Sequence, residues 1–145
     1  MPAAPMRAFL GFIAGAIALL TFHQGLVELL YLAGAGGPAW SVQPVPPFGT
    51  PRVVDLCFSA GLWGALFGLL LPRLTSPLWM CGIILGLVAA MFGWFVVAPL
   101  KGLPVANGWV PMNMARSLLV NGFFGLGVGL ILPLLMPRPL VRAHT

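Results

Sequence analysis

Residues 8–33 read AFLGFIAGAIALLTFHQGLVELLYLA, an apolar stretch long enough to cross a membrane as a helix. Three more apolar runs follow, at about residues 53–71, 78–98 and 114–136. None of the four alternates between polar and apolar residues as a membrane strand does, and lipid offers no hydrogen-bond partners to an unpaired backbone. The sequence therefore predicts an all-α protein, a bundle of four transmembrane helices that forms one integral membrane domain over residues 1–145.

The composition excludes most other classes of protein. Hydrophobic residues make up 60% of the chain and charged residues only 6%, whereas a soluble domain has about 25% charged residues. So few charges cannot cover a surface that faces water. They are also too few for a disordered tail or for a protein that binds nucleic acid. The lipid bilayer is therefore the first partner that the sequence predicts, and nucleic acid is excluded.

The positions of the basic residues predict how the helices are oriented. With four spans both termini lie on one side of the membrane, and basic residues in short loops favour the cytoplasmic side. The basic residues on the side of the termini are Arg7, Arg73, Arg138 and Arg142, and those on the other side are Arg52, Lys101 and Arg116. The majority lies with the termini, so we predict that the N-terminus and the C-terminus are both inside.

The two halves of the chain resemble each other, which suggests an internal duplication. At an offset of 61 residues, residues 61–64 (GLWG) align with residues 122–125 (GFFG), and Pro72 aligns with Pro133. An offset of 71 residues relates the first apolar run to the third. Each half is then a helix, an outer loop and a helix, and the halves are parallel repeats related by an axis along the membrane normal. The alternative is that glycine-rich apolar helices align by chance.

Every apolar run also carries two glycines four residues apart, a spacing that lets helix backbones approach closely in lipid. The pairs are Gly11 and Gly15, Gly64 and Gly68, Gly82 and Gly86, and Gly125 and Gly129. All four pairs fall in the inner half of their helices. We therefore expect a tightly packed inner half and a more open outer half.

The two outer loops differ in composition. The first, about residues 34–52, holds five prolines and few charges, so we expect it to be stiff and to lie on the protein or at the membrane interface. The second, about residues 99–113, carries Asn107-Gly108, which predicts a turn. The aromatic residues predicted to mark the outer interface are Tyr31, Trp40 and Trp109, with Trp79 at the inner interface.

Ionisable residues inside a membrane are costly and are therefore candidates for function. Glu28, Asp55 and Arg116 lie at similar depths below the outer ends of their helices, and Asp55 and Arg116 are equivalent in the duplication. We predict that these three residues form a partly buried cluster with Arg52 at its edge. We interpret it first as a structural ion-pair network, because buried charges are tolerated chiefly when they are paired. The alternative is a site for a proton or a small anion at Arg116.

His23 lies near the middle of the first span and points away from a polar stripe that includes Gln24. An imidazole there suits a proton relay or an interhelical hydrogen bond, and we favour the hydrogen bond. Gln24 and, in the fourth run, Asn121 are further candidates for a relay or for ligand contacts. The other histidine, His144, lies in the tail, so haem or pigment ligation by His23 would need another chain. We predict no cofactor.

No catalytic motif is visible in the sequence. It contains no GxSxG, HExxH or P-loop pattern, and its two acidic residues are not paired beside a plausible acid. Cys57 and Cys81 fall near opposite membrane faces, so they predict neither a disulfide nor a metal site. We therefore predict that the protein is not an enzyme and holds no metal.

Three short motifs carry a resemblance to a known family. Residues 22–25 (FHQG), 46–51 (PPFGTP) and 61–64 (GLWG) resemble a family of small, uncharacterised bacterial inner-membrane proteins with four predicted helices. The resemblance covers most of the chain and implies a multi-pass protein of the bacterial inner membrane. It places His23 and Gln24 within the family pattern, but it implies no activity.

We weigh two functions against each other, beside a third hypothesis of an anchor that holds a cofactor together with another chain. We favour a small non-catalytic accessory or assembly subunit of a larger membrane complex, such as a bioenergetic one, because the chain has glycine packing faces, a stiff loop and no catalytic set. Its partners would be other membrane subunits or further copies of the chain. The alternative is a proton-coupled transporter of small molecules or ions that acts as an oligomer and uses His23, Glu28, Asp55 and Arg116.

Overall fold

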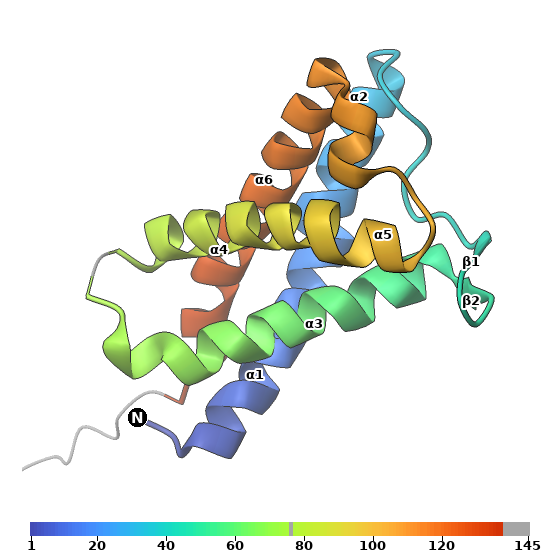
Figure 1. Ribbon diagram of the computed structural model, residues 1–145. Helices are drawn as coiled ribbons and strands as arrows, with labels where there is room; N and C mark the ends of the chain where they lie inside the picture. The colour runs from blue at the N-terminus through green and yellow to red at the C-terminus, as the bar shows by residue number, and fades with distance from the viewer. Residues whose placement is uncertain (76, 138–145) are drawn as a thin grey trace, which may run out of the picture.

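The computed structural model describes residues 1–75 and 77–137, and its architecture is all-helical (Figure 1). Arg138, Arg142 and His144, which entered the predictions above, lie outside the described residues. Four helical spans are long and apolar enough to cross a membrane, as predicted: Ala4–Leu32, Arg52–Arg73, Leu78–Leu100 and Pro111–Leu135. The first begins earlier than predicted because Pro5 fits the first turn of a helix, where no backbone N–H is needed.

Two of the spans contain short π-helical segments. The first span consists of α1 (Ala4–Ala18), the π-helical segment η1 (Leu19–His23) and α2 (Gln24–Leu32). The third consists of α4 (Leu78–Phe92), the π-helical segment η3 (Gly93–Val97) and α5 (Ala98–Leu100). The second is α3 (Arg52–Leu70) with the 3₁₀ turn η2 (Leu71–Arg73), and the fourth is α6 (Pro111–Leu135). Since π-helical turns are rare, their occurrence in the first helix of each sequential pair is a shared feature of the two halves.

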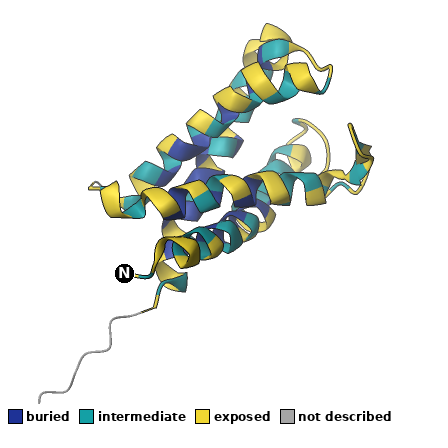
Figure 2. Ribbon diagram, turned by 60° about the horizontal axis from the view of Figure 1, so that its bottom comes forward, coloured by how far each residue is buried: buried dark blue, intermediate teal, exposed yellow. Residues whose placement is uncertain are grey.

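The helices pack as two hairpins. α1 makes its most extensive contacts with α3, and α4 does so with α6. Contacts between α1 and α6 join the hairpins, whereas α3 and α4 touch each other only sparsely. Buried residues face the inside of the bundle and exposed ones cover its outer surfaces (Figure 2). The core that joins the hairpins includes Ala14, Ala18, Leu19, Phe67, Phe124, Val128 and Leu132.

The two ends of the bundle are distinguished here by their connections. The terminal end carries the N-terminus and residues 71–75 and 77, and the loop end carries residues 33–51 and 101–110. In the terminal half, glycines lie on backbone carbonyls of the partner helix. A Cβ at Gly11 would overlap the carbonyl oxygen of Gly64, for example. This close approach increases dispersion contacts between the helices, which matters in lipid because apolar side chains gain little by leaving it.

The same glycine contacts recur in both hairpins. The contact of Gly11 with Gly64 is matched by that of Gly82 with Gly125, at offsets of 71 and 61 residues. Two further pairs match at these offsets: Gly15 on Ala60 with Gly86 on Asn121, and Gly68 on Arg7 with Gly129 on Leu78. All eight glycines of the four spaced pairs therefore lie against the backbone of a partner helix.

The first loop folds back onto the bundle, as predicted. It runs beside α2 in Figure 1 and ends in a short antiparallel hairpin made of β1 (Pro44–Val45) and β2 (Thr50–Pro51). The backbone N–H of Arg52 then donates to the carbonyl of Gln43 at 2.9 Å. The hairpin is thereby tied to the start of α3.

The second loop is a compact turn. Its 3₁₀ segment η4 (Val105–Trp109) contains four successive residues with positive φ: Ala106, Asn107, Gly108 and Trp109. This confirms the turn predicted at Asn107, since asparagine and glycine adopt the left-handed conformation more readily than most residues. Ala106 is fully buried, so the turn packs against the end of the bundle.

Candidate functional site

A chamber lies between the two hairpins in the loop half, beyond the glycine contacts. Its volume is about 320 Å³, which is within the range of pockets that bind small molecules. All four spans contribute to its walls, with Leu19, Leu56, Ala90 and Phe124 as examples. The side chains that bring polar atoms to it are His23, Arg52, Asp55, Ser59, Trp94, Lys101, Asn107, Ser117 and Asn121. The chamber lies in the half for which the sequence predicts looser packing.

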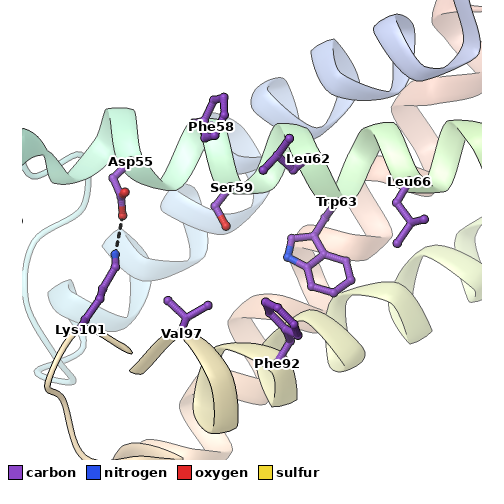
Figure 3. Close-up of a pocket in the computed structure, with 9 residues that line it drawn as sticks. All are labelled: Asp55, Phe58, Ser59, Leu62, Trp63, Leu66, Phe92, Val97 and Lys101. Carbon is purple, nitrogen blue, oxygen red and sulfur yellow. Dashed lines mark hydrogen bonds and ion pairs between the residues drawn. The ribbon is translucent and has the colours of Figure 1, made fainter. Parts of the chain in front are cut away.

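A groove of about 450 Å³ adjoins this chamber, between α3 and the third span (Figure 3). The residues that line both spaces are Asp55, Ser59, Trp63, Phe92, Val97 and Lys101. The rings of Trp63 and Phe92 meet edge to face with centroids 5.5 Å apart. Phe58 and Leu62 line the groove and are 60% and 53% exposed. In a membrane these exposed apolar residues contact lipid, so the groove faces the bilayer.

One ion pair crosses the groove at its loop end. Lys101 Nζ donates to Asp55 Oδ2 at 2.9 Å, and both side chains are partly exposed. Within residues 1–75 and 77–137 this is the one salt bridge, and it joins the start of α3 to the residue that follows α5. The sequence predicts Arg116 as the partner of Asp55, and this is wrong. Lys101 lies outside the helix, and its long side chain reaches Asp55 from there.

Glu28 and Arg116, two other charged residues of the predicted cluster, have different partners from this pair. Arg116 Nη2 donates to Asn113 Oδ1 at 3.2 Å, and the Arg116 guanidinium lies close to Gly36 of the first loop. Glu28 Oε2 accepts a hydrogen bond from the backbone N–H of Ala39 at 3.0 Å. The predicted cluster is therefore not formed, because the first loop contacts the groups that the prediction paired across helices. Arg52 lines the chamber, as Asp55 does.

Polar residues of the first span hold the first loop in place. Gln24 is only 4% exposed, and its Oε1 accepts a hydrogen bond from the backbone N–H of Trp40 at 2.7 Å. The Trp40 indole donates to the carbonyl of Leu20, within η1, at 3.0 Å. Leu20 lies about 18 Å before the end of α2 along the helix. Trp40 is therefore an anchor that holds the loop along the helix.

His23 borders the chamber and belongs to the same hydrogen-bond network. Because the oxygen of the Gln24 amide accepts from Trp40, its nitrogen donates, and it donates to His23 Nδ1 at 2.9 Å. The neutral imidazole then carries its proton on Nε2. The ring lies edge-on to Phe124 of α6 with centroids 6.4 Å apart. The hydrogen bond predicted between helices runs instead to the next residue of the same helix.

The second π-helical segment forms another wall of the chamber. Trp94 is buried in η3, and its indole donates to Ser117 Oγ of α6 at 3.0 Å. Asn121 Nδ2 donates to the carbonyl of Ser117 at 2.9 Å. Asn121 lines the chamber together with Trp94 and Ser117, two residues that sequence reasoning missed. A π-helical turn is frequent at functional sites, but nothing in the composition of residues 93–97 marks one.

No family model, no curated protein and no solved structure matches this chain. The candidate site therefore rests on its geometry. The chamber combines apolar and aromatic walls with a small number of polar groups, which is the usual lining of a small-molecule site. Such a lining can bind a molecule that has both an apolar body and a polar group. It is the candidate functional site of this protein.

Proposed function

We propose that the protein is a membrane-embedded carrier that binds a small amphipathic molecule in the chamber between its hairpins. The observation that carries this proposal is the chamber of about 320 Å³, which is lined by all four spans and shares six lining residues with the groove beside it. Of the two functions considered from the sequence, this favours a transporter. A subunit that only fills space in a complex would be expected to pack without such a cavity.

The residues of the chamber would divide the task of binding between them. Trp63 and Phe92 would pack against the apolar part of the molecule, as aromatic residues do in most ligand sites. The polar part of the molecule would bind to the polar side chains of the chamber, which include the charged Arg52 and Lys101. His23 Nε2 would donate a further hydrogen bond and Asn121 Oδ1 would accept one, because the other polar atom of each of these two side chains already has a protein partner. No covalent step is part of this proposal.

The matched glycine contacts support two parallel hairpin repeats, each made of a helix, a loop and a helix. An axis along the membrane normal would pass between the hairpins, where the chamber lies. In transporters built from repeats, substrates bind at the interface between the repeats. We propose the N-in and C-in orientation for this protein, which puts the loop end outside, and the bacterial inner membrane as its location.

The proposal is tested by solubilising the protein gently from its own membranes and weighing the intact assembly by mass spectrometry. We expect the chain alone or as a homo-oligomer, with an amphipathic molecule bound non-covalently. Ser59→Phe fills the groove from an exposed position and should remove the bound molecule. Val54→Phe, on an exposed α3 residue that lines neither space, is the matched control and should keep it.

Two results would contradict the carrier proposal. One is a bound molecule that survives Ser59→Phe unchanged, because the molecule would then lie elsewhere. The other is isolation with stoichiometric larger subunits and no bound small molecule. That result would support the accessory subunit instead.

A further inference from the structure

We infer that the ligand is an anionic lipid, whose acyl chain lies in the groove and whose headgroup binds at Arg52 and Lys101. The inference rests on the proposed function and names the class of its ligand. Two separate features carry it. One is the apolar length of the groove, and the other is the excess of positive charge at its loop end.

The groove has the length of one acyl chain. Its wall on α3 runs from Asp55 to Leu66, a distance of about 16 Å at the helical rise per residue. The hydrocarbon core of a bilayer is about 30 Å thick, so one leaflet is about 15 Å deep. Beyond Asp55 this wall is apolar or aromatic except for Ser59, and Phe92 and Val97 face it from the third span (Figure 3). A chain that enters at the loop end would therefore span one leaflet.

One uncompensated positive charge, that of Arg52, lies on the chamber beside the loop end of the groove. Asp55 and Lys101 neutralise each other across 2.9 Å. Arg52 borders the chamber beside them and, in the described part of the chain, has no carboxylate within 4.0 Å. An unpaired charge at the edge of the hydrocarbon is costly. An anionic headgroup would pair with Arg52 and could also accept a hydrogen bond from Lys101.

A soluble anion could use the same charge, but the surroundings favour a lipid. Phe58 and Leu62 form an exposed apolar rim along the groove, and in a membrane this rim is in contact with acyl chains. A soluble anion would occupy only the charged end and leave the apolar length unfilled. An amphipathic anion from the loop-side leaflet fills both parts.

The test uses the full-length protein in phosphatidylcholine vesicles with traces of photoactivatable lipid. Two probes carry the same diazirine near the end of one acyl chain, one with an anionic phosphatidylglycerol headgroup and the other with a phosphatidylcholine headgroup. After irradiation, digestion and mass spectrometry, we expect the anionic probe to label residues 58–66 and 92–97 about tenfold more than the neutral one. That ratio corresponds to one charge-assisted hydrogen bond. Unlabelled phosphatidylglycerol should compete, and free glycerol phosphate should not.

Three variants assign the labelling to the groove and its charge. Arg52→Gln should bring the ratio between the two probes close to one. Arg73→Gln makes the same change at the other end of the same span, away from the groove, and should leave the ratio unchanged. Ser59→Phe fills the groove and should remove the excess labelling by the anionic probe, leaving only the labelling of Phe58 and Leu62 by the surrounding lipid.

Each contrary result has a separate meaning. Equal labelling by both probes, unaffected by Arg52→Gln, would overturn the anionic-lipid inference and leave the carrier proposal intact with an uncharged ligand. Competition by glycerol phosphate would also overturn it, because the site would then belong to a soluble anion. No labelling of the groove by either probe would overturn it as well. If no small molecule co-purified in the earlier experiment either, the carrier proposal would fail too.

Discussion

The terminal half and the loop half of this bundle use the same four helices in opposite ways. In the terminal half, Gly11 and Gly82 lie on the backbone of their partner helices, and there is no room for even one methyl group. In the loop half, two π-helical segments and a set of aromatic and polar side chains surround a chamber. A small membrane protein can therefore hold a cavity in one half of its bundle when the other half is tightly packed and supports it.

The largest expected effect comes from breaking the tight half. Gly64→Leu places a side chain where a Cβ alone would overlap the carbonyl of Gly11, so α1 and α3 could not close. We expect at least about 3 kcal/mol of destabilisation or the loss of folded protein, because overpacking a close contact forces the backbone apart. Thermal unfolding in detergent measures this.

The control for that variant is Gly25→Ala, where an added Cβ has no neighbour within 4 Å. It should be neutral or up to about 1 kcal/mol more stable, since alanine favours a helix over glycine. Similar losses for both variants would show that the glycine contacts do not hold the terminal half together.

The next effect tests the likeness of the two hairpins. Gly11→Ala and Gly82→Ala insert the same methyl group at matched contacts, so each should cost about 1–3 kcal/mol. Because the two sites lie in different hairpins, we expect the double variant to be additive within about 0.5 kcal/mol. Chemical unfolding of the two single variants and the double variant provides the comparison. A large difference between the single variants would contradict the repeat.

A smaller effect is expected where the loop half is covered by the first loop. Gln24→Ala leaves the backbone N–H of Trp40 without its acceptor, which costs about 1–3 kcal/mol at a buried site. The loss should be local, and hydrogen exchange should quicken in residues 33–43. Thr21→Ala is the control, because the Thr21 hydroxyl bonds only to the carbonyl of Ile17 in its own helix. Equal exchange in both variants would argue against the anchoring role of Gln24.

The smallest effect concerns the ion pair across the groove. A double-mutant cycle with Asp55→Asn and Lys101→Gln should give a coupling energy of only about 0.2–1 kcal/mol, because both side chains are partly exposed. The matched cycle of Asp55→Asn with Arg116→Gln should give none. A larger coupling in the second cycle would restore the cluster that the sequence predicts.

The spans could be predicted from the sequence because length and apolarity decide them locally. The first span begins one helical turn earlier than predicted, at Ala4, because of Pro5. The chain reversal at Asn107 was predicted from residue types that tolerate a left-handed backbone. These features depend on short segments, so no knowledge of the partner helices was needed.

The candidate site could be predicted only in part. Polar groups in an apolar span are costly, so they are candidates for function. Four of the residues chosen on this ground line the chamber: His23, Arg52, Asp55 and Asn121. Their partners could not be predicted. The first loop returns along α2 and supplies backbone N–H groups to Gln24 and Glu28, and Lys101 reaches Asp55 from outside the helices. Those contacts depend on the path of the loops in space. The depth of a residue along its helix does not predict that path.

The central claim is that the loop half holds a chamber that admits small molecules, and the accessibility of two α6 positions to water tests it most directly. Asn121 lines the chamber, whose lining extends to Arg52, Lys101 and Asn107 at the loop end, whereas Leu119, two residues before Asn121, is 56% exposed on the outer surface. Each is changed to cysteine in a chain whose Cys57 and Cys81 are alanine, and the protein in vesicles is treated with a charged thiol reagent. We expect the cysteine of Asn121→Cys to react with the reagent from the loop side, and the cysteine of Leu119→Cys not to react. Equal reactivity at both positions, or none at either, would contradict the central claim.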